Sequence, residues 1–454
     1  MPASGNYNGT SLNNRGTNGN YWTSSFNSAT NAYNLNFNSS NVNPQNNNNR
    51  RNGRTVRPVQ HSLRCERKYT EDSMEYKLTR EALLLDLHAA YQCAKRKKAN
   101  KPYVRAFERN LEENLNRLAD DLINRTYQPE PSSCFIVEKP KKREVFAAQF
   151  RDRVVHHLYF NYTHRIFERT FIADTYSCIE GRGTHYGIER MKKHIRQESH
   201  NWQRECYVLK IDIRGYFMHI NRQRLLEIAT ETLRHCSKTS TRYMDMDFVL
   251  WLTREIVMLD PKRSCHIIGS KKNWEGLDRN KSLFYTPEGC GLPIGNLTSQ
   301  LFSNVYLNEL DQFMKRVLKC KHYGRYVDDA YVVSCDKEWL QLIIQKVQEF
   351  LQQHLCLDLH MGKTRIYNVR KGVDFLGAYI LPYRTYISNE SLNRMIEHIR
   401  ILDTKNRNAT IRSVNSWLGV LSHYDSFNIR CELFFNKRFL SISTFDRNMT
   451  KMNE

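Results

Sequence analysis

Two adjacent carboxylates stand between two β-prone runs in the stretch 322–334, which reads HYGRYVDDAYVVS. The flanking runs predict a β-hairpin that carries Val327, Asp328 and Asp329 at its tip. Two like charges held side by side raise each other's cost of ionisation, and a divalent cation such as Mg²⁺ removes that cost because it prefers carboxylate oxygens. The stretch therefore predicts half of a metal site; the alternative is an Asp-Asp turn exposed to water.

A further carboxylate lies in a second β-prone run, 206–217, which reads CYVLKIDIRGYF. Alternation with a period of two separates two faces of this strand, one with Tyr207, Leu209, Ile211 and Ile213 and the other with Val208, Lys210 and Asp212. A lone acid at the end of a strand is usually solvated, so Asp212 is informative only together with the Asp-Asp pair.

A loop rich in glycine and proline, 289–296, leads into an expected helix that is capped near Asn296. Apolar side chains then recur at helical spacing, among them Leu297, Leu301 and Val305. The free backbone amides at such a helix start suit a phosphate or a closely approaching nucleotide.

In this order, the three elements resemble the palm motifs of reverse transcriptases: the motif-A Asp at Asp212, the Gly-rich loop and helix of motif B, and the Tyr-x-Asp-Asp of motif C at 326–329. The resemblance extends from about Arg80 to about Cys431. It implies an α+β chain with the right-hand polymerase fold, which combines fingers, a palm with an antiparallel sheet and a helical thumb. It also implies an RNA-directed DNA polymerase, a nucleotidyltransferase that binds template RNA, the primer–cDNA duplex and dNTPs.

On this basis four parts are expected: a low-complexity Asn-rich tail at 1–59, N-terminal helices and fingers at 60–205, a palm at 206–384 and a thumb at 385–454. Amphipathic patterns predict helices at 75–97 and 103–127 before the fingers and at 338–355 in the palm. The segment 236–288 inside the palm is basic and irregular, and its sequence indicates no role.

The resemblance implies two Mg²⁺ ions, with Mn²⁺ as an alternative ion, held by Asp212, the carbonyl of Ile213, Asp328 and Asp329. Asp212 and Asp328 are the expected bridging ligands. Asp329 follows Asp328 directly, so on an extended strand its side chain should point away from that pair. Lys363, in a run that resembles motif D, is expected to protonate the leaving pyrophosphate.

The basic hairpin 135–145 resembles the fingers segment that covers the incoming triphosphate, and Lys139 and Arg143 are its candidate phosphate ligands. Phe217 stands five residues after Asp212, where an aromatic ring in this family excludes ribonucleotides; the alternative is core packing. The resemblance also places Ile294 and Gly295 against the incoming nucleotide and Phe375, Leu376 and Gly377 in the primer grip.

Two further runs, 151–156 and 176–185, match fingers motifs that hold the template; the alternative is that their charged residues form salt bridges that hold the fold. The thumb places basic side chains where a duplex backbone would pass, at Arg394, Arg400, Lys405, Arg407 and Arg412.

Most reverse transcriptases carry Gln at the position of Ile294. The run Ile294-Gly295-x-x-x-Ser299-Gln300 instead resembles the enzymes of diversity-generating retroelements, within the group II intron-like bacterial reverse transcriptases. In that family cDNA is mutated at template adenines and transferred to a variable gene (mutagenic retrohoming), and the polymerase works with a small basic helical accessory protein. The alternatives are a retron or group-II-like enzyme without a mutagenic role, and a non-catalytic RNA-binding protein on a polymerase fold.

Within the tail, the runs 19–25 and 54–59 resemble the closing stretch of the C-type-lectin-like variable proteins of these retroelements. Asn codons are rich in adenine, and this predicts that residues 1–59 are a translated template repeat and that the true start lies downstream, at Met74. The alternative is a disordered tail, because Asn, Ser and Gly cannot bury a core.

The chain carries 69 Lys and Arg against 47 Asp and Glu, a net charge of +22 that indicates a polyanionic partner such as nucleic acid; the alternative is a solvated basic surface. Its 12 Cys include no Cys-x-x-Cys pair and suit a reducing cytoplasm. No apolar run has membrane-spanning length and no signal-peptide core is found, so a soluble cytoplasmic protein without a membrane partner is expected.

Overall fold

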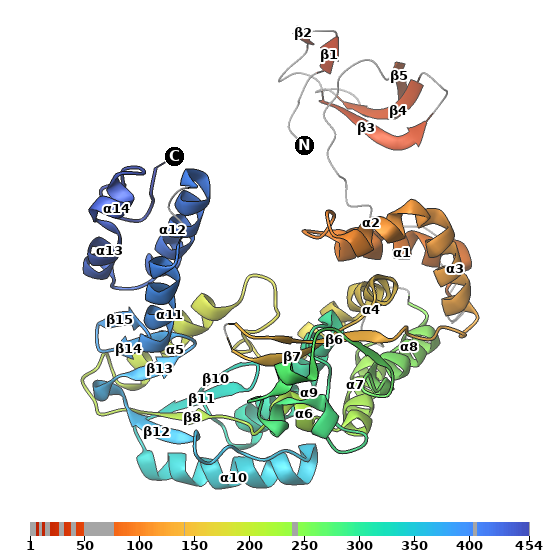
Figure 1. Cartoon of the computed structure of the whole chain (residues 1–454). Coiled ribbons are helices and arrows are strands. Elements are labelled where there is room, and N and C mark those ends of the chain that lie inside the picture. The colour runs from red at the N-terminus through yellow and green to blue at the C-terminus, as the bar shows by residue number, and fades with distance from the viewer. Residues whose placement is uncertain are drawn as a thin grey trace. The chain divides into compact units, whose positions relative to one another are not determined.

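The computed structural model describes residues 77–139, 141–237, 244–402 and 406–453, together with five strands before residue 50. The chain divides into two units, Met1–Met74 and Glu75–Glu454. In the first unit two antiparallel sheets form, one from β1 (Asn6–Asn8) and β2 (Ser11–Asn13) and one from β3 (Gly19–Phe26), β4 (Asn31–Phe37) and β5 (Val42–Asn49) (Figure 1). The interpretation of residues 1–59 as a translated repeat stays a prediction, and Met74 lies outside the described residues.

The second unit begins with helices that pack into the largest hydrophobic core: α1 (Arg80–Lys95), α2 (Pro102–Arg109), α3 (Leu111–Ile123) and α4 (Phe150–Glu168). The prediction of one helix over 103–127 is wrong, because the chain breaks at Asn110 between α2 and α3. Asn114 Nδ2 donates a hydrogen bond to the Phe107 carbonyl at 2.9 Å across this break. The apolar spacing persists through it because Phe107 and Leu115 still face the same core.

The fingers carry a hairpin of β6 (Ser132–Val137) and β7 (Arg143–Ala147), which confirms the predicted basic hairpin. The later part of the segment 236–288 packs beside it, as β9 (Cys265–Ile267) and the short helices η1 (Lys271–Trp274), η2 (Arg279–Lys281) and η3 (Leu283–Tyr285). The earlier part forms α8 (Met246–Met258), which packs on α4 in the largest core. Strand β9 pairs in parallel with β6. The buried Glu144 of β7 accepts three hydrogen bonds from this segment, donated by Trp274 Nε1 at 2.6 Å, Ser282 Oγ at 2.7 Å and Leu283 N at 2.6 Å. The segment therefore braces the fingers hairpin.

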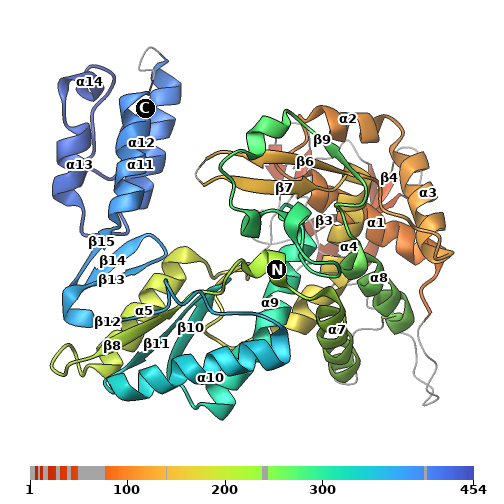
Figure 2. The same cartoon turned by 60° about the horizontal axis from the view of Figure 1, so that its bottom comes forward.

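The palm is a four-stranded antiparallel sheet in the order β10 (His322–Tyr326), β11 (Asp329–Ser334), β8 (Tyr207–Ile211) and β12 (Arg365–Asn368). One face packs on α9 (Leu297–Gln312) and α10 (Lys337–Leu355), and the other face packs on α5 (Thr184–Glu198) (Figure 2). Leu209 and Ile211 belong to the first core and Val208 to the second, which confirms the two faces predicted for this strand.

Further elements complete the palm: α6 (Tyr216–His219), α7 (Arg222–Ser237), the π-helical turn η4 (Phe313–Val317) and the turn η5 (Val369–Lys371). Asn221 Oδ1 accepts a hydrogen bond from Arg224 N at 2.9 Å and so caps α7. Helix α10 matches the helix predicted at 338–355 within one residue.

The loop between β10 and β11 is shorter than predicted, because Tyr326 pairs with Asp329 and leaves only Val327 and Asp328 outside the ladder. Val327 has φ +55°, an unusual conformation for a β-branched residue. Its amide donates to Ser177 Oγ at 3.1 Å, and its carbonyl accepts from Arg325 Nη1 at 2.8 Å. The loop is therefore anchored on both sides.

Arg325 itself forms a fully buried ion pair with Asp311 of α9, with Nη2 2.7 Å from Oδ2 and Nε 2.8 Å from Oδ1. Tyr323 Oη and Thr175 Oγ1 donate to the same carboxylate at 2.7 and 3.0 Å. Arg325 Nη1 also donates to Asn304 Oδ1 at 3.2 Å. A buried pair is tolerated only when its remaining donors and acceptors are satisfied in this way, and here it ties the hairpin to α9.

Beyond the palm, the antiparallel strands β13 (Val373–Phe375), β14 (Ala378–Leu381) and β15 (Arg384–Ile387) lead into α11 (Asn389–Arg400), α12 (Arg407–Leu421), α13 (Phe427–Phe434) and α14 (Lys437–Leu440). These helices share a separate core, which includes Met395, Leu418 and Phe434. The expected α+β right-hand polymerase fold, with fingers, palm and thumb, is confirmed. Within the part of the chain that the structure describes, no helix is long and apolar enough to cross a membrane.

Replacing Arg325 by Ala should lower the free energy of unfolding by about 3–5 kcal/mol, because it leaves the buried Asp311 carboxylate without its counter-charge. Arg117 provides the control, since its i,i+4 pair with Glu113 is exposed and Arg117→Ala should cost only about 0.3–0.5 kcal/mol. Urea unfolding curves of the two variants measure both values. Equal losses in the two variants would contradict the structural role assigned to Arg325.

Candidate active site

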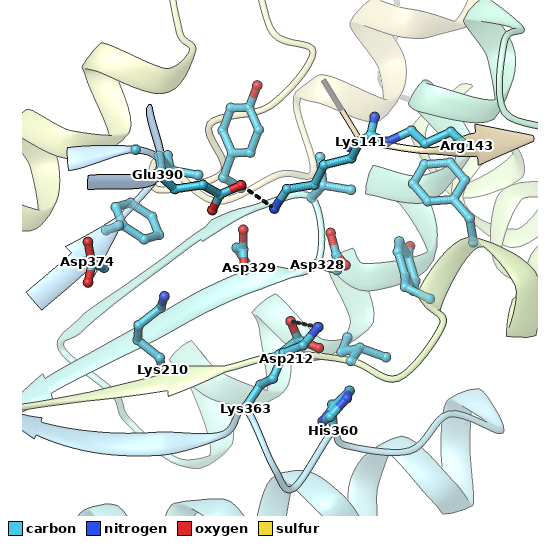
Figure 3. Close-up of a pocket in the computed structure, with 18 of the residues that line it drawn as sticks. Lys141, Arg143, Lys210, Asp212, Asp328, Asp329, His360, Lys363, Asp374 and Glu390 are labelled. Atoms are coloured by element: carbon cyan, nitrogen blue, oxygen red, sulfur yellow. Dashed lines mark hydrogen bonds and ion pairs between the residues drawn. The ribbon is translucent and has the colours of Figure 1, made fainter. Parts of the chain in front are cut away.

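One large cavity of about 2020 Å³ collects most of the side chains that the sequence singles out (Figure 3). It lies among the fingers hairpin, the palm sheet and the start of α11. The predicted site residues that line it are Arg143, Asp212, Ile213, Phe217, Ile294, Gly295, Asp328, Asp329, Lys363, Phe375, Leu376 and Gly377. Lys139 does not line it.

Strand pairing brings the three acids of this cavity together. Asp212 directly follows β8, Asp328 is in the two-residue loop, and Asp329 begins β11. Because Ala330 pairs with Ile211, the next residues outward, Asp329 and Asp212, reach the same end of the sheet. Asp329 was expected to point away, on the assumption of a continuous strand. That expectation is wrong, because Asp328 belongs to the turn and Asp329 lines the cavity as well.

The acids are costly to ionise together. Burial, followed by the charges of Asp329 and Asp212, raises the pKa of Asp328 to about 6. Burial also raises the pKa of Asp329, and the charge of Lys210 opposes that rise. Crowded carboxylates of this kind favour a bound cation.

These acids fit Mg²⁺ in the way that polymerase-type sites bind it. The described residues contain no finished cluster of three or more His, Cys, Asp or Glu side chains around a metal position. Mg²⁺ does not require one, since it is usually held by one or two carboxylates together with waters and substrate phosphates. Ile213 follows Asp212 and lines the same cavity, so its carbonyl is a candidate further oxygen ligand.

Lys363 lies beside Asp212, with Nζ 3.4 Å from Oδ2. Backbone bonds hold this loop to the strand that carries Asp212, since His360 N donates to the Asp212 carbonyl at 2.8 Å and Arg214 N donates to the Asp358 carbonyl at 2.9 Å. The position of Lys363 at the acids is therefore set by the main chain, while its side chain remains mostly exposed.

The Gly-rich loop is joined to the fingers rather than standing free. The carbonyl of Ile294 accepts from Phe146 N at 2.9 Å, and the half-buried Ile294 side chain lines the cavity. Gly295 has φ +128°, and a Cβ there would lie 2.9 Å from Val145 Cγ1, so only glycine fits. Asn296 occupies the N-cap position of α9 as predicted, but its side chain makes no cap bond and accepts from Ala148 N at 3.2 Å.

Phe217 lies between the hydrophobic core and the cavity, so its position agrees with both core packing and contact with a nucleotide. It lies on α6, directly after the left-handed Gly215, and its ring is 5.4 Å from the ring of Tyr216. It packs partly against two core clusters and also faces the cavity.

Of the two candidate triphosphate ligands, Arg143 lines the cavity and Lys139 lies exposed outside it. Lys141 and Lys142 of the same basic run line it as well, although nothing in the sequence distinguishes them from Lys139. Lys142 Nζ donates to the Glu275 carbonyl at 2.7 Å, and Lys141 Nζ forms an ion pair with Glu390 of α11 at 3.2 Å (Figure 3).

In the fingers motif 151–156, Arg151 and Asp152 bind other residues of the protein. Arg151 pairs with Asp121 at 2.5 Å, and Asp152 accepts from Tyr127 Oη at 2.8 Å and from Glu130 N at 2.9 Å. For Arg151 and Asp152 the salt-bridge alternative therefore holds.

In the motif 176–185, Arg182 Nη1 donates to the carbonyls of Ile172 and Thr175 at 3.2 and 2.8 Å. Its guanidinium therefore also binds the protein main chain.

The expected primer grip is a tight turn beside the acids. Phe375 pairs with Ala378, so Leu376 and Gly377 form a two-residue turn with φ +50° and +85°. The buried Phe375 ring packs edge-on against Tyr331 of β11 at 5.1 Å, which fixes the turn to the palm.

Among the thumb cations, Arg394 also lines the cavity, and Lys405 lies outside the described residues.

Asp328→Asn should raise the melting temperature of the metal-free protein near pH 7, because it removes a charge that burial and two acids disfavour. The pKa rise from 3.8 to about 6 corresponds to a gain of about 1–3 kcal/mol. The native state binds this proton more tightly than the unfolded state, so the gain should shrink as the pH falls from 7 towards 4. Mg²⁺ should stabilise the wild type more than the variant.

Asp358→Asn serves as the control, since Asp358 is an exposed acid outside the cavity. A loss of stability in metal-free Asp328→Asn at pH 7 would contradict the crowding of the acids.

Comparison with known proteins places this geometry in a family. The model of the family "Reverse transcriptase (RNA-dependent DNA polymerase)" matches residues 139–380. Protein YkfC of Escherichia coli (strain K12) is 25% identical over 305 residues, which cover 60% of this chain and 72% of that protein.

Among solved structures, apo telomerase from Candida tropicalis is 12% identical with a TM-score of 0.43, covering 72% of this chain and 60% of that chain. Telomerase from Candida albicans, in complex with a fragment of telomeric RNA, is 11% identical with a TM-score of 0.42, covering 69% and 55%. This chain thus spans less than two thirds of either telomerase chain. The family match extends from the fingers hairpin to β14 over more than half of the sequence, and the chain belongs to the reverse transcriptase (RNA-dependent DNA polymerase) family.

Proposed function

We propose that this RNA-directed DNA polymerase copies a template RNA into cDNA by two-metal nucleotidyl transfer in the large cavity, within a diversity-generating retroelement. The observation that carries the catalytic part is the convergence of Asp212, Asp328 and Asp329 on one cavity, with the pKa of Asp328 raised to about 6. A protein that only bound RNA would gain nothing from holding three acids together at this cost.

Asp212 and Asp328 would hold the metal ions, and Asp329 and the Ile213 carbonyl would supply further oxygen ligands. When bound, Mg²⁺ or Mn²⁺ would supply activation of the primer 3′-hydroxyl and neutralisation of the triphosphate. Arg143 can hold a phosphate through two parallel N–H donors, and Lys141 and Lys142 add point charges from the same hairpin.

Three further features of the cavity are proposed to act directly on the substrates. Lys363, beside Asp212, is placed to give a proton to the leaving pyrophosphate. Phe217 presents its ring to the cavity and is proposed to exclude a 2′-hydroxyl. The turn Phe375-Leu376-Gly377 is proposed to hold the primer end.

Asp328→Asn should abolish Mg²⁺-dependent dNTP addition to a DNA primer on an RNA template, because the amide keeps the volume of the carboxylate but not its charge. Primer extension by the wild type, Asp328→Asn and the control Asp358→Asn measures this, with melting curves to show that each variant is folded. Appreciable synthesis by folded Asp328→Asn would refute the metal assignment, and no extension by the wild type would favour the non-catalytic alternative.

The retroelement part rests on Ile294. Its half-buried side chain lines the cavity next to Gly295, and an apolar side chain offers the incoming nucleotide contact without a hydrogen bond. If correct insertion depends more than wrong insertion on a hydrogen bond at this position, the absence of that hydrogen bond lowers fidelity. The proposed partners are the template RNA, the primer–cDNA duplex, dNTPs and a small basic helical accessory protein. An adenine-marked near-repeat of the DNA encoding residues 13–59 beside a lectin-like gene would distinguish this from a retron or group-II-like enzyme.

Ile294→Gln should raise catalytic efficiency for correct dNTPs several-fold and lower misincorporation opposite template adenine. A hydrogen bond contributes about 0.5–1.5 kcal/mol, and about 1.36 kcal/mol is tenfold in rate. Single-nucleotide insertion kinetics opposite A, C, G and U measure both effects, and Ile294→Leu is the matched variant that stays apolar. An unchanged misinsertion ratio at adenine in folded Ile294→Gln would place the source of infidelity elsewhere.

A further inference from the structure

A smaller cavity of about 360 Å³ opens beside the main one, at the edge of the palm sheet. It shares Lys210, Asp212, Asp329, Gly362 and Lys363 with the main cavity and adds Ile211, Arg365 and Tyr367. The acids can therefore be approached from two directions, from the fingers and from the side of β12.

Two cations face each other in this side cavity. Lys210 and Arg365 are directly paired in the β8–β12 ladder, on the sheet face that also carries Val208 and Tyr367 and packs on the second core. Like charges at paired positions of an antiparallel sheet are destabilising. The carboxylates of Asp212 and Asp329 in the same cavity offset part of this cost, and a phosphate group bound between the two cations would offset more of it.

Neither cation is neutralised by a hydrogen-bonded partner within the part of the chain that the structure describes. Among the described residues, Arg365 donates only through Nε, to the Gly362 carbonyl at 3.0 Å, which orients the guanidinium and leaves its two terminal nitrogens without a described partner. Lys210 forms no ion pair within 4.0 Å with any residue that the structure describes, although it is close enough to Asp329 to act on that carboxyl. The pair thus presents a positive groove beside the acids.

The direction of the reaction identifies the anion. Figure 3 shows Lys210 and Asp374 on one side of the three acids and Arg143 on the other. In an in-line displacement the attacking and leaving oxygens stand on opposite sides of the phosphorus atom. A triphosphate held by the fingers therefore places the primer hydroxyl on the side of Lys210, which is also the side of the small cavity.

We propose that Lys210 and Arg365 form a phosphate clamp for the primer backbone just upstream of its 3′ end. This rests on the proposed function, from which it takes the side of the triphosphate. The guanidinium of Arg365 suits a phosphate group through two donors, and Lys210 adds a point charge from the facing strand. Binding of the strand neutralises a repulsion that the free protein has to tolerate.

The test is binding of a fluorescent DNA primer–RNA template duplex, measured by anisotropy over a salt series in EDTA and without dNTPs. Lys210→Gln and Arg365→Gln should each weaken binding several-fold and reduce the slope of log K against log salt by about 0.7–0.9. Arg370→Gln and Lys371→Gln are matched controls, since both residues are exposed near β12 and line neither cavity. These controls should bind as the wild type does.

Two further readouts separate the clamp from other roles. Without nucleic acid, the melting temperature of Arg365→Gln should equal or exceed that of the wild type, because one repelling charge is gone; a merely structural role would lower it. Pyrophosphate inhibition of primer extension should be unchanged. Duplex binding at wild-type strength in both variants would overturn the proposal, and so would weaker pyrophosphate inhibition with unchanged duplex binding. The proposed function fails separately, if the wild type does not extend a primer with Mg²⁺.

Discussion

The buried ion pair between Arg325 and Asp311 is the contact on which the catalytic hairpin depends. Both side chains are inaccessible to water, and the pair joins β10 to α9 across the palm. Its guanidinium also donates to the carbonyl of Val327, the residue before Asp328. A buried pair is not in itself a strong source of stability, because desolvation offsets its attraction. Here it serves mainly to position the hairpin, since the same arginine that neutralises Asp311 also holds the loop that presents an acid to the cavity.

Two groups of basic side chains approach the acids of that loop, one from the fingers hairpin and one from the edge of the palm sheet. Arg143, Lys141 and Lys142 face the acids from the fingers hairpin, which the segment 236–288 braces through Glu144. Lys210 and Arg365 face them from the edge of the palm sheet. A negative centre between two positive approaches suits a reaction that joins two phosphate-bearing substrates from opposite directions. The net charge of +22 thus has a local arrangement that composition alone does not show.

Local pattern and charge predicted much of this site, whereas long-range contacts decided the rest. The alternation in β8 separated Leu209 and Ile211 from Val208 correctly, because each face of a sheet packs on its own core. The break at Asn110 was missed because the apolar spacing continues through it. Asn296 occupies the predicted N-cap position, but its side chain accepts a hydrogen bond from the amide of Ala148, which is distant in sequence. Lys139 and Lys141 are indistinguishable in a basic run, and only the turn of the hairpin decides which one faces inward.

The most direct test of this account is the rate of Mg²⁺-dependent dNTP addition on an RNA template by Arg325→Lys, measured beside the wild type at a temperature where both are folded. Lysine keeps the charge opposite Asp311 but cannot also reproduce the planar set of bonds to Asn304 and Val327. The account predicts ready extension by the wild type and a rate at least about tenfold lower for the variant, equivalent to about 1.4 kcal/mol or more of barrier. Equal rates, or no templated synthesis by the wild type, would contradict it.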